Sequence, residues 1–584
     1  MGKVVFVIMK IHYLIATLVL GACCHCMAQL EVSENLSSSA DASLKKLGSY
    51  LNGQLEEKDL AIFVSGEWKG VNIVTVGKID QRVVPGDIKV SMKPVDLTGK
   101  MSDSIYSLAK WKASYGEKIH RTKFKIVRVL VNEDLPGKFT TETLMMAIST
   151  KNGNLNEVHQ RWKAQWQIKG EKAQLLNMNL MSEHAAGLVG EKPLYADRTS
   201  AVLVQEKERE ILLNQGANYW MQRLETALRP DFFGETGVSV ADVNGDGRED
   251  VYISQLGGLP NQLFIQQQNG VFKELQNALG LDILDNTTGA VFADLDNDGD
   301  QDAVLATAGG VAIYENATSD TRTEFVLKKQ FPKAIYGNGM CVADYDQDGL
   351  LDFYVCQYYA TVEDKRGREN TGAKQLTRGN FPAPYPVFDA TNGGRNGLYK
   401  NTGEMDFEDV TDLVGLGVSN SRYSYAAMWE DWDNDGDQDL YVVNDFGPNI
   451  YYRNEGGTFL DASQESGLVG KAFGMGVTSG DYNGDGWMDI HVSNMFSSAG
   501  SRVTRQKEFK SDSSPQIKRI FELLARGNTL MVNKAGKFED SSEESGITVG
   551  RWSWGCLSPD INNDGYEDLL VANGFVTGKE KDDL

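Results

Sequence analysis

Short apolar runs rich in β-branched and aromatic residues recur along the C-terminal part of the chain, and a polar loop separates each pair of runs. Residues 237–241 (GVSVA) and 251–255 (VYISQ) are the first such pair. Runs of this length and composition, bounded by aspartate and glycine, are typical of β-strands. The pattern therefore predicts a series of units, each made of a strand, a loop and a second strand.

The polar loop has one acidic pattern, which occurs in six places. Position one is always aspartate, position six is always glycine, and positions five and nine are always aspartate. A self-similar segment that recurs in the same register is the mark of a repeat protein. The six copies are DVNGDGRED (242–250), DLDNDGDQD (294–302), DYDQDGLLD (344–352), DWDNDGDQD (431–439), DYNGDGWMD (481–489) and DINNDGYED (560–568).

Each loop carries the oxygen donors that a calcium ion requires. Calcium takes roughly six to eight oxygens, so its loop needs carboxylates or amides on alternate residues, a free carbonyl and a glycine at the bend. Positions one, three, five and nine supply side-chain oxygens, and position seven supplies a carbonyl. We therefore predict up to six calcium ions. The predicted ligands are Asp242, Asn244, Asp246, Arg248, Asp250, Asp294, Asp296, Asp298, Asp300, Asp302, Asp344, Asp346, Asp348, Leu350, Asp352, Asp431, Asp433, Asp435, Asp437, Asp439, Asp481, Asn483, Asp485, Trp487, Asp489, Asp560, Asn562, Asp564, Tyr566 and Asp568.

An EF-hand is the obvious alternative for such loops, and two features exclude it. An EF-hand loop ends in a glutamate at position twelve and lies between two helices. Position twelve is apolar in all six copies, and the flanking segments have the composition of strands. These position-twelve residues are Ile253, Leu305, Val355, Val442, Val492 and Val571.

The spacing of the loops predicts a β-propeller. The opening aspartates are 52, 50, 87, 50 and 79 residues apart, a period near fifty with two insertions. A period of about forty to fifty residues with four strands is typical of a propeller blade. Segments such as 398–410 (LYKNTGEMDFEDV) and 451–463 (YYRNEGGTFLDAS) supply the remaining two strands of each period.

These repeats resemble the FG-GAP or VCBS repeat propellers, the fold of the integrin α-subunit head. Residues 425–449, 494–500 and 550–578 are similar to the cartilage acidic protein family, whose members often continue into an ASPIC/UnbV module. The resemblance covers roughly 216–584. It implies a mainly β fold: a calcium-binding β-propeller of six to seven four-stranded blades, preceded by a small α+β domain.

Ring closure stays open at this point. The first repeat unit is expected to lack its two leading strands, and no seventh unit follows the sixth loop. Either the chain is truncated, or the region before residue 235 completes the ring. A fold of this kind serves many functions, so function has to be argued from a site.

The remaining chain divides by composition. Residues 30–200 predict a small α+β domain, and residues 201–230 predict a linker helix ahead of the propeller at 231–584, with insertions at 357–394 and 495–527. In the α+β domain, Trp162 and Trp166 either line a pocket or belong to the core, and we favour the core.

Residues 1–28 have the features of a targeting segment. Two lysines precede a short apolar run, too short for a stable membrane span. Either Cys23 is the lipidated residue of a lipoprotein signal, or ordinary cleavage follows Ala28. Both interpretations place the protein outside the cytoplasm, in a secreted, periplasmic or lipid-anchored form, and Cys23 is the one expected membrane attachment.

The charge of the chain argues against a nucleic-acid partner. The sequence has 81 acidic and 58 basic residues, for a net charge of −23. Nucleic acids select the opposite sign, whereas the acidic loops account for much of this charge as metal ligands.

No catalytic motif stands out. His491 is the only histidine of the predicted propeller, and it alternates with apolar residues as a structural side chain does. We therefore favour a binding or adhesion module for a protein or glycan partner over an enzyme. A polysaccharide-acting enzyme on the same propeller is the alternative.

The ends of the strands that follow the last three loops differ from the earlier ones. They carry Asn-x-Phe sequences at 444–446, 494–496 and 573–575. Amides beside aromatic rings suit sugar or peptide recognition, and a turn-capping role is the alternative. The insertion at 495–527 has seven basic and three acidic residues, which fits either an anionic ligand or a solvated helix. The ligand-face candidates are Asn444, Asp445, Asn494 and Asn573.

Overall fold

A computed structural model gives the fold, and its described part falls into two units. It describes residues 24–574, except for 73–79, 85–87, 94–104, 132–134, 136, 189–197, 205–209, 216, 221, 225–235, 276–279, 320–322, 333, 335–336, 360–383, 385, 471–472 and 562–564. Unit 1 comprises the chain up to Ala196 together with Ser497–Ala525, and unit 2 contains the remaining sheets. The predicted targeting residue Cys23 and the loop residues Asn562 and Asp564 lie outside the described residues.

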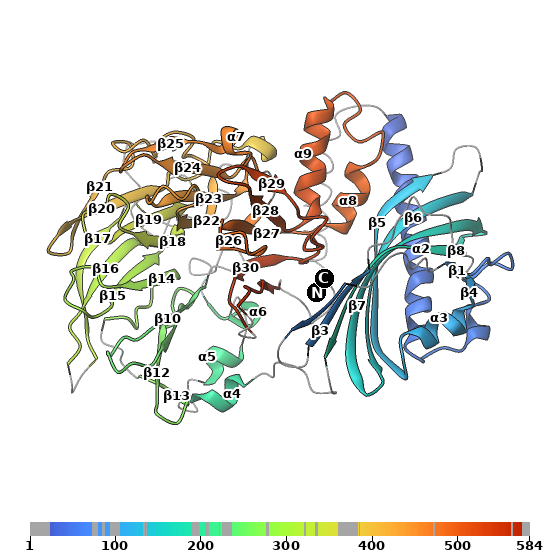
Figure 1. Cartoon of the computed structure of the whole chain (residues 1–584), viewed down its shortest axis with the longest axis horizontal. Coiled ribbons are helices and arrows are strands. Elements are labelled where there is room, and N and C mark those ends of the chain that lie inside the picture. Colours follow the sequence, from blue (N-terminus) through green and yellow to red (C-terminus); the bar gives the residue numbers. More distant parts are fainter. Residues whose placement is uncertain are drawn as a thin grey trace. The chain divides into compact units, whose positions relative to one another are not determined.

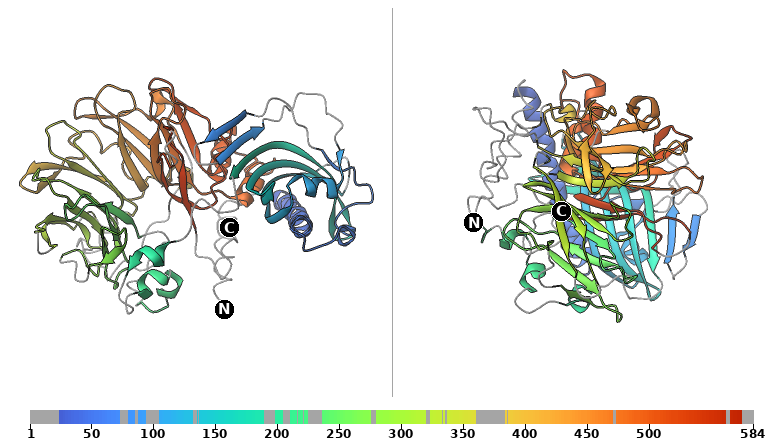
Figure 2. Two further views of the ribbon diagram at one scale, coloured as in Figure 1. Left: turned by 60° about the horizontal axis from the view of Figure 1, so that its bottom comes forward. Right: turned by 90° about the vertical axis from the view of Figure 1, so that its left-hand side faces the viewer.

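Unit 1 is a mainly antiparallel sheet packed against a long helix (Figure 1). The sheet has the order β2-β3-β8-β7-β6-β5, β1 pairs in parallel with β8, and β4 pairs with β1. Figure 2 shows the long strands curving around α2 and α3. The elements are α2 (Cys24–Leu51), η1 (Glu57–Leu60), β1 (Val71–Asn72), β2 (Asp80–Val84), β3 (Ile88–Lys93), β4 (Ile105–Tyr106), α3 (Leu108–Ser114), β5 (Lys118–Val131), β6 (Lys138–Lys151), β7 (Asn154–Lys169) and β8 (Lys172–Leu188).

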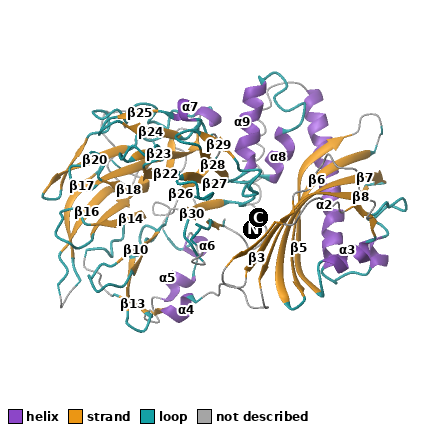
Figure 3. Ribbon diagram, in the orientation of Figure 1, coloured by secondary structure: helices purple, strands orange, loops and turns teal. Residues whose placement is uncertain are grey.

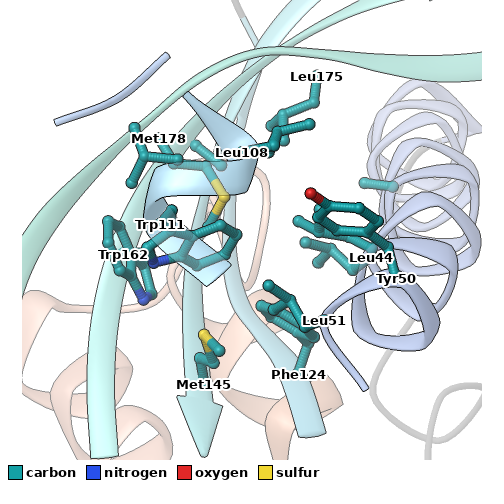
Figure 4. Packing of buried hydrophobic residues seen from close by; sticks show 14 of the residues in the cluster. Leu44, Tyr50, Leu51, Leu108, Trp111, Phe124, Met145, Trp162, Leu175 and Met178 are labelled. Atoms are coloured by element: carbon teal, nitrogen blue, oxygen red, sulfur yellow. The ribbon is translucent and has the colours of Figure 1, made fainter. Parts of the chain in front are cut away.

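The core of unit 1 lies between α2, α3 and the inner face of the sheet (Figure 4). Alternate residues of β7 point into it, so that Trp162 and Trp166 are 0% and 1% exposed. Trp162 meets Trp111 of α3 edge to face, with ring centroids 5.5 Å apart. The interpretation of Trp162 and Trp166 as core residues is confirmed.

The insertion at 495–527 folds as two helices, α8 (Ser498–Thr504) and α9 (Pro515–Arg526), and α8 packs on β5 of unit 1. Arg502 forms an ion pair with Glu34 of α2 at 2.8 Å and donates to the carbonyl of Ile126. At least one of the seven basic residues therefore holds the insertion in place within unit 1. No local sequence pattern predicts this contact, because the partner residues are hundreds of positions away.

Among the described residues, unit 2 contains a succession of six sheets, and four of these have four antiparallel strands in chain order. Figure 3 shows the strands of these sheets in orange. The first sheet gains a fifth strand, β9, which pairs in parallel with β13. The sheets are β10 (Val238–Ala241), β11 (Asp250–Ile253), β12 (Gln262–Gln266) and β13 (Phe272–Glu274) with β9 (Leu203–Val204); β14 (Thr287–Ala293), β15 (Asp302–Thr307), β16 (Gly310–Asn316) and β17 (Phe325–Phe331); β18 (Gly337–Ala343), β19 (Asp352–Gln357), β20 (Gly397–Gly403) and β21 (Asp406–Asp409); β22 (Tyr423–Glu430), β23 (Asp439–Phe446), β24 (Ile450–Asn454) and β25 (Phe459–Asp461); β26 (Gly474–Gly480), β27 (Asp489–Asn494), β28 (Thr529–Asn533) and β29 (Phe538–Asp540); and β30 (Ser553–Leu557) with β31 (Leu570–Asn573).

Consecutive sheets pack face to face through their first strands, β10 on β14, β14 on β18, β18 on β22, β22 on β26 and β26 on β30. Residues from both partners fill each interface: Trp432 and Tyr441 of the fourth sheet pack with Ile490 and Val492 of the fifth. Blades of a propeller pack in this way, each burying the apolar face of its neighbour. The mainly β expectation is confirmed.

One expectation about chain organisation is wrong. The first sheet is complete, because β12 and β13 follow the first acidic hairpin through short local connections, and among the described residues it is the last sheet that has only two strands. Within the predicted linker helix at 201–230, the described residues include short elements. These are α4 (Thr199–Val202), α5 (Glu210–Asn214) and α6 (Ala217–Trp220), with β9 after the first of them.

Most of the other insertion, 357–394, lies outside the described residues; its described part contains η3 (Val387–Asp389). The fourth sheet is followed by the short helix α7 (Ser463–Ser466). None of the helices in the described ranges is both long and apolar enough to cross a membrane.

His491 of β27 is a buried histidine that weakens the protein at acidic pH. It is 0% exposed, and neither ring nitrogen has a hydrogen-bond partner among the described residues. Burial lowers the pKa of His491 to about 4. Because protonation is then easier in the unfolded chain, stability falls as the pH drops from about 6.5 toward 4, by up to roughly 3 kcal/mol.

The substitution His491→Leu is therefore expected to raise the melting temperature at pH 5 by several degrees relative to the parent protein. At pH 7.5 the gain is smaller and comes from removing two unsatisfied polar atoms. Thermal melts of both proteins at the two pH values measure it. Equal pH dependence in the two proteins would show that His491 does not titrate during unfolding.

Candidate functional site

The acidic loops connect the first two strands of each sheet, and the carboxylate at position one folds them. In the fourth loop, Asp431 accepts the backbone N–H groups of Asp435 and Gly436 at 3.1 and 3.0 Å. Gly436 has φ +98°, a conformation that favours glycine. The same two bonds form in the loops that begin at Asp242, Asp294, Asp344 and Asp481.

The aspartate at position nine is buried and fastens the loop to the third strand. Asp439 is 0% exposed. Its Oδ1 accepts the N–H of Asn454 at 2.8 Å, and its Oδ2 accepts the hydroxyl of Tyr451 at 2.7 Å and the N–H of Trp432. Burial raises the pKa of Asp439 to about 7. A nearby cation would favour the ionised form that these donors require.

In the second to fifth sheets, a buried asparagine at the end of the third strand links the acidic loop to the loop of the preceding sheet. Asn454 donates to the carbonyl of Tyr345, in the preceding loop, at 2.8 Å and to that of Gln438, in its own loop, at 3.1 Å. Asn316, Asn401 and Asn533 make the corresponding pairs of bonds. Sequence analysis missed this contact, although the recurring asparagine in YEN, YKN, YRN and MVN is visible in the chain.

Among the described residues, three loops gather carboxylates closely enough to hold a metal ion. In each group the donor oxygens lie within 4.8 Å of one another. The second loop uses positions one, three and nine, whereas the third and fourth use positions one, three and five. The groups are Asp294, Asp296 and Asp302; Asp344, Asp346 and Asp348; and Asp431, Asp433 and Asp435.

Several loop oxygens are buried and have no hydrogen-bond partner in the described part of the chain. They are Oδ1 of Asp300, Asp346 and Asp433, and Oδ2 of Asp489. An unpaired buried carboxylate oxygen is costly unless a cation or a donor meets it. Burial and the neighbouring aspartates also raise the pKa of Asp300 to about 6. An all-oxygen donor set with these orphaned atoms fits a hard cation such as calcium.

The predicted ligands at the remaining positions also lie in the loops. The backbone N–H groups of Arg248, Leu350 and Trp487 donate to the position-five carboxylates, and the guanidinium of Arg248 pairs with Asp246. In the sixth loop, Asp560 accepts the N–H of Gly565 at 2.8 Å.

The opposite ends of the strands carry the predicted ligand-face residues, and two of the three asparagines there form hydrogen bonds within the protein. Asn444 is 0% exposed and donates to the carbonyl of Pro448, and Asn494 donates to Thr529 at 3.1 Å. Asn573 is exposed. The turn-capping alternative therefore describes Asn444 and Asn494 well.

Asp445 follows the first of these asparagines and is buried beneath aromatic rings. Its carboxylate accepts the hydroxyl of Tyr358. Burial raises the pKa of Asp445 to about 7, and the bond from Tyr358 acts against this rise. Tyr358 in turn packs edge to face on Tyr423, with ring centroids 5.2 Å apart.

Half-buried aromatic side chains surround this pair at the same strand ends. Phe446 packs on Phe473 at 5.6 Å, and Tyr425 packs on Trp554 at 6.0 Å between ring centroids. They come from the ends of β23, β22 and β30 and from the segment before β26. We call Tyr359, Tyr425, Phe446, Phe473 and Trp554 the aromatic edge. Sequence analysis identified only Phe446 among them, because the others are not in a repeated motif.

Comparison with known proteins agrees with the repeat pattern. The family described as "FG-GAP-like repeat" matches residues 242–305, 294–355 and 431–492. Each match begins at one acidic loop and ends in the strand that follows the next acidic loop. The chain therefore contains FG-GAP-like repeats.

Among curated proteins, the chain is similar to cartilage acidic protein 1. It is 23% identical to the Xenopus tropicalis protein over 293 residues, which is 44% of this chain and 40% of the relative. The Homo sapiens protein is 24% identical over 288 residues, 44% of this chain and 39% of the relative. The match thus spans about two fifths of these relatives.

Among solved structures, the comparison finds an Agrocybe aegerita lectin that recognises non-reducing terminal N-acetylglucosamine. The lectin is 14% identical, the alignment covers 80% of this chain and 90% of that chain, and the TM-score is 0.30. A similarity of this size assigns neither fold nor ligand to the present chain.

Proposed function

We propose that the protein is an extracytoplasmic β-propeller module, stiffened by calcium in its acidic loops, that binds a glycan through the aromatic edge. The main support for this proposal is that the two ends of the strands carry different chemical groups. At one end, carboxylates fold the loops and leave buried oxygens for a cation. At the other, half-buried aromatic rings gather around a carboxyl group.

The oxygen donors of the acidic loops support calcium binding. Calcium binding and the predicted targeting segment at residues 1–28 both support an extracytoplasmic location. Extracellular modules bind calcium with dissociation constants of roughly 10⁻⁴ to 10⁻³ M. Such sites fill outside the cytoplasm, where calcium is abundant. A structural calcium site and an exported chain are therefore consistent with each other.

A glycan suits the aromatic edge because sugar rings present C–H groups that pack on aromatic faces, and their hydroxyl groups seek nearby polar atoms. Half-buried rings such as Tyr425 and Trp554 are rigid and lose little conformational freedom on binding. Small-molecule sites are typically aromatic with a few polar groups. Asp445 and Tyr358 are such groups beneath the rings.

A polysaccharide-cleaving enzyme remains the second candidate, and Asp445 is the observation that favours it. A carboxyl group with a pKa of about 7 can donate a proton near neutral pH. Glycoside hydrolysis ordinarily uses a pair of carboxyl groups, whereas the hydrogen-bond partner of Asp445 is Tyr358. We therefore favour binding.

Substitution of the aromatic edge tests the proposal. Binding is read on a glycan array with and without calcium. Trp554→Ala and Tyr425→Ala are each expected to weaken binding to the glycans by at least about tenfold. Leu413→Ala is the matched control, because Leu413 is 83% exposed after the outermost strand of its sheet. Equal glycan binding by all the variants, or no glycan binding by the parent, would reject the aromatic edge as a glycan site. Release of shortened sugars by the parent protein would favour the enzyme.

A further inference from the structure

The third acidic loop holds a side-chain ammonium group between two of its carboxylates. In the first loop the guanidinium of Arg248 pairs with Asp246, and in the fifth loop Nζ of Lys534 lies 3.8 Å from Asp485. Lys400 of β20 places Nζ 3.0 Å from Oδ2 of Asp348, and it also pairs with Asp346. These are positions five and three of the loop. The pair is sheltered: the Lys400 side chain is 27% exposed and that of Asp346 is 20% exposed.

Lys400 occupies a position that recurs in the first five sheets. It directly precedes the residue whose backbone N–H donates to the position-nine aspartate, which is Gln266 in the first sheet and an asparagine in the second to fifth sheets. The residues at this position differ in charge. They are Ile265, Glu315, Lys400, Arg453 and Val532 in the first to fifth sheets.

The second sheet has the opposite charge at this position. Glu315 acts electrostatically on Asp296 and Asp300 and so adds a carboxylate to an already acidic loop. Its own partner is Lys328, at 2.7 Å. The second loop therefore has a carboxylate, and not a cation, at the position that Lys400 occupies in the third sheet.

Arg453 in the fourth sheet does not pair closely with the carboxylates of its loop, as Lys400 does. Its guanidinium binds Glu455 at 2.7 Å and also pairs with Glu465, whereas the nearest oxygen of Asp433 is 4.0 Å away. Oδ1 of Asp433 and Oδ1 of Asp346 are both buried without a hydrogen-bond partner among the described residues. The two loops differ in the basic side chain, because Lys400 lies 3.0 Å from a carboxylate of its loop and Arg453 lies 4.0 Å from one of its own. The fourth loop therefore depends more on an external cation than the third loop does.

We propose that Lys400 is a built-in cation of the third loop, so that this loop holds its shape without calcium and binds calcium much more weakly than the second loop. The proposal rests on the proposed calcium binding and adds which loops use it. A tethered ammonium between two carboxylates competes with the ion for the same oxygens. It offsets their repulsion at any calcium concentration.

The test compares Lys400→Met with Arg453→Met, which removes a cation from the same position of the next sheet. Calcium binding is measured by isothermal titration, and melting is measured in calcium and in chelator. Lys400→Met is expected to bind one more calcium ion, with at least about tenfold higher affinity at that loop, and to melt several degrees lower in chelator while recovering in calcium. Arg453→Met is expected to leave the number of bound ions unchanged.

The reciprocal variant, Glu315→Lys, keeps the proposal testable if Lys400→Met fails to fold. It installs a tethered cation at the second loop and is expected to bind one calcium ion fewer while melting higher in chelator. An unchanged ion count in both variants, or an equal loss of melting temperature for Lys400→Met in calcium and in chelator, would overturn the role of Lys400. A parent protein that binds no calcium at all would instead reject the proposed calcium sites.

Discussion

Removal of calcium is expected to lower the melting temperature of this protein by about ten degrees or more. At millimolar calcium, a site with a dissociation constant of roughly 10⁻⁴ M stabilises the fold by on the order of 1 kcal/mol. Several such loops together contribute several kcal/mol, and each kcal/mol shifts the melting temperature of a domain of this size by a few degrees. Thermal melts in calcium and in chelator measure the difference.

Single loops account for part of this loss. Asp298→Ala and Asp435→Ala each remove the position-five carboxylate and are expected to lower the melting temperature in calcium by a few degrees. Each variant should differ much less from the parent in chelator, where the loop has no ion to lose. Magnesium is the control ion, because it prefers a tighter octahedral site. A melt of the parent protein that is the same in chelator and in calcium would refute a structural role for the ion.

The second large effect is expected from Asp439→Ala, which should destabilise the protein by about 3–5 kcal/mol whether or not calcium is present. The substitution leaves three donors without their acceptor: the N–H groups of Asn454 and Trp432 and the hydroxyl of Tyr451. All three lie in the packed interior of the fourth sheet. Urea unfolding in calcium and in chelator gives the two free energies of unfolding.

The matched control is Asp435→Ala in the same loop, whose effect should depend on calcium. If Asp439→Ala behaves like Asp435→Ala, with a loss that disappears in chelator, then Asp439 serves mainly as a metal ligand. A small loss in both conditions would instead mean that other groups satisfy the three donors.

The loops and the strands beside them could be predicted because their signals are local. A glycine at position six and alternate carboxylates specify the turn, and β-branched runs such as 303–307 specify the strand. The order of strands within each sheet was harder to predict. The sequence shows that four strands recur, but not that the acidic hairpin opens each sheet.

Contacts between distant residues were beyond the sequence pattern. The bond from Asn454 to the carbonyl of Tyr345 crosses from one sheet to the next, and its only sequence signal is a recurring asparagine. Lys400 carries no recurring signal, because its position changes residue type in every sheet. The docking of Arg502 on Glu34 joins segments that only the folded chain brings together.

The sequence predicted where the candidate ligand face lies, but not which side chains are available there. The Asn-x-Phe sequences pointed to the strand ends opposite the loops, yet the amides of Asn444 and Asn494 are occupied by protein atoms. The aromatic rings that remain partly exposed there come from four sheets and from no common motif. A surface assembled from residues that break the repeat cannot be recognised from the repeat.

A count of bound calcium tests directly whether the acidic loops are calcium sites. Equilibrium dialysis at millimolar calcium, followed by elemental analysis, gives the number of ions per chain. We expect about five, since calcium binds weakly at the third loop, and one fewer in Asp298→Ala. A chain that retains no calcium above the level of the dialysis buffer would contradict this expectation.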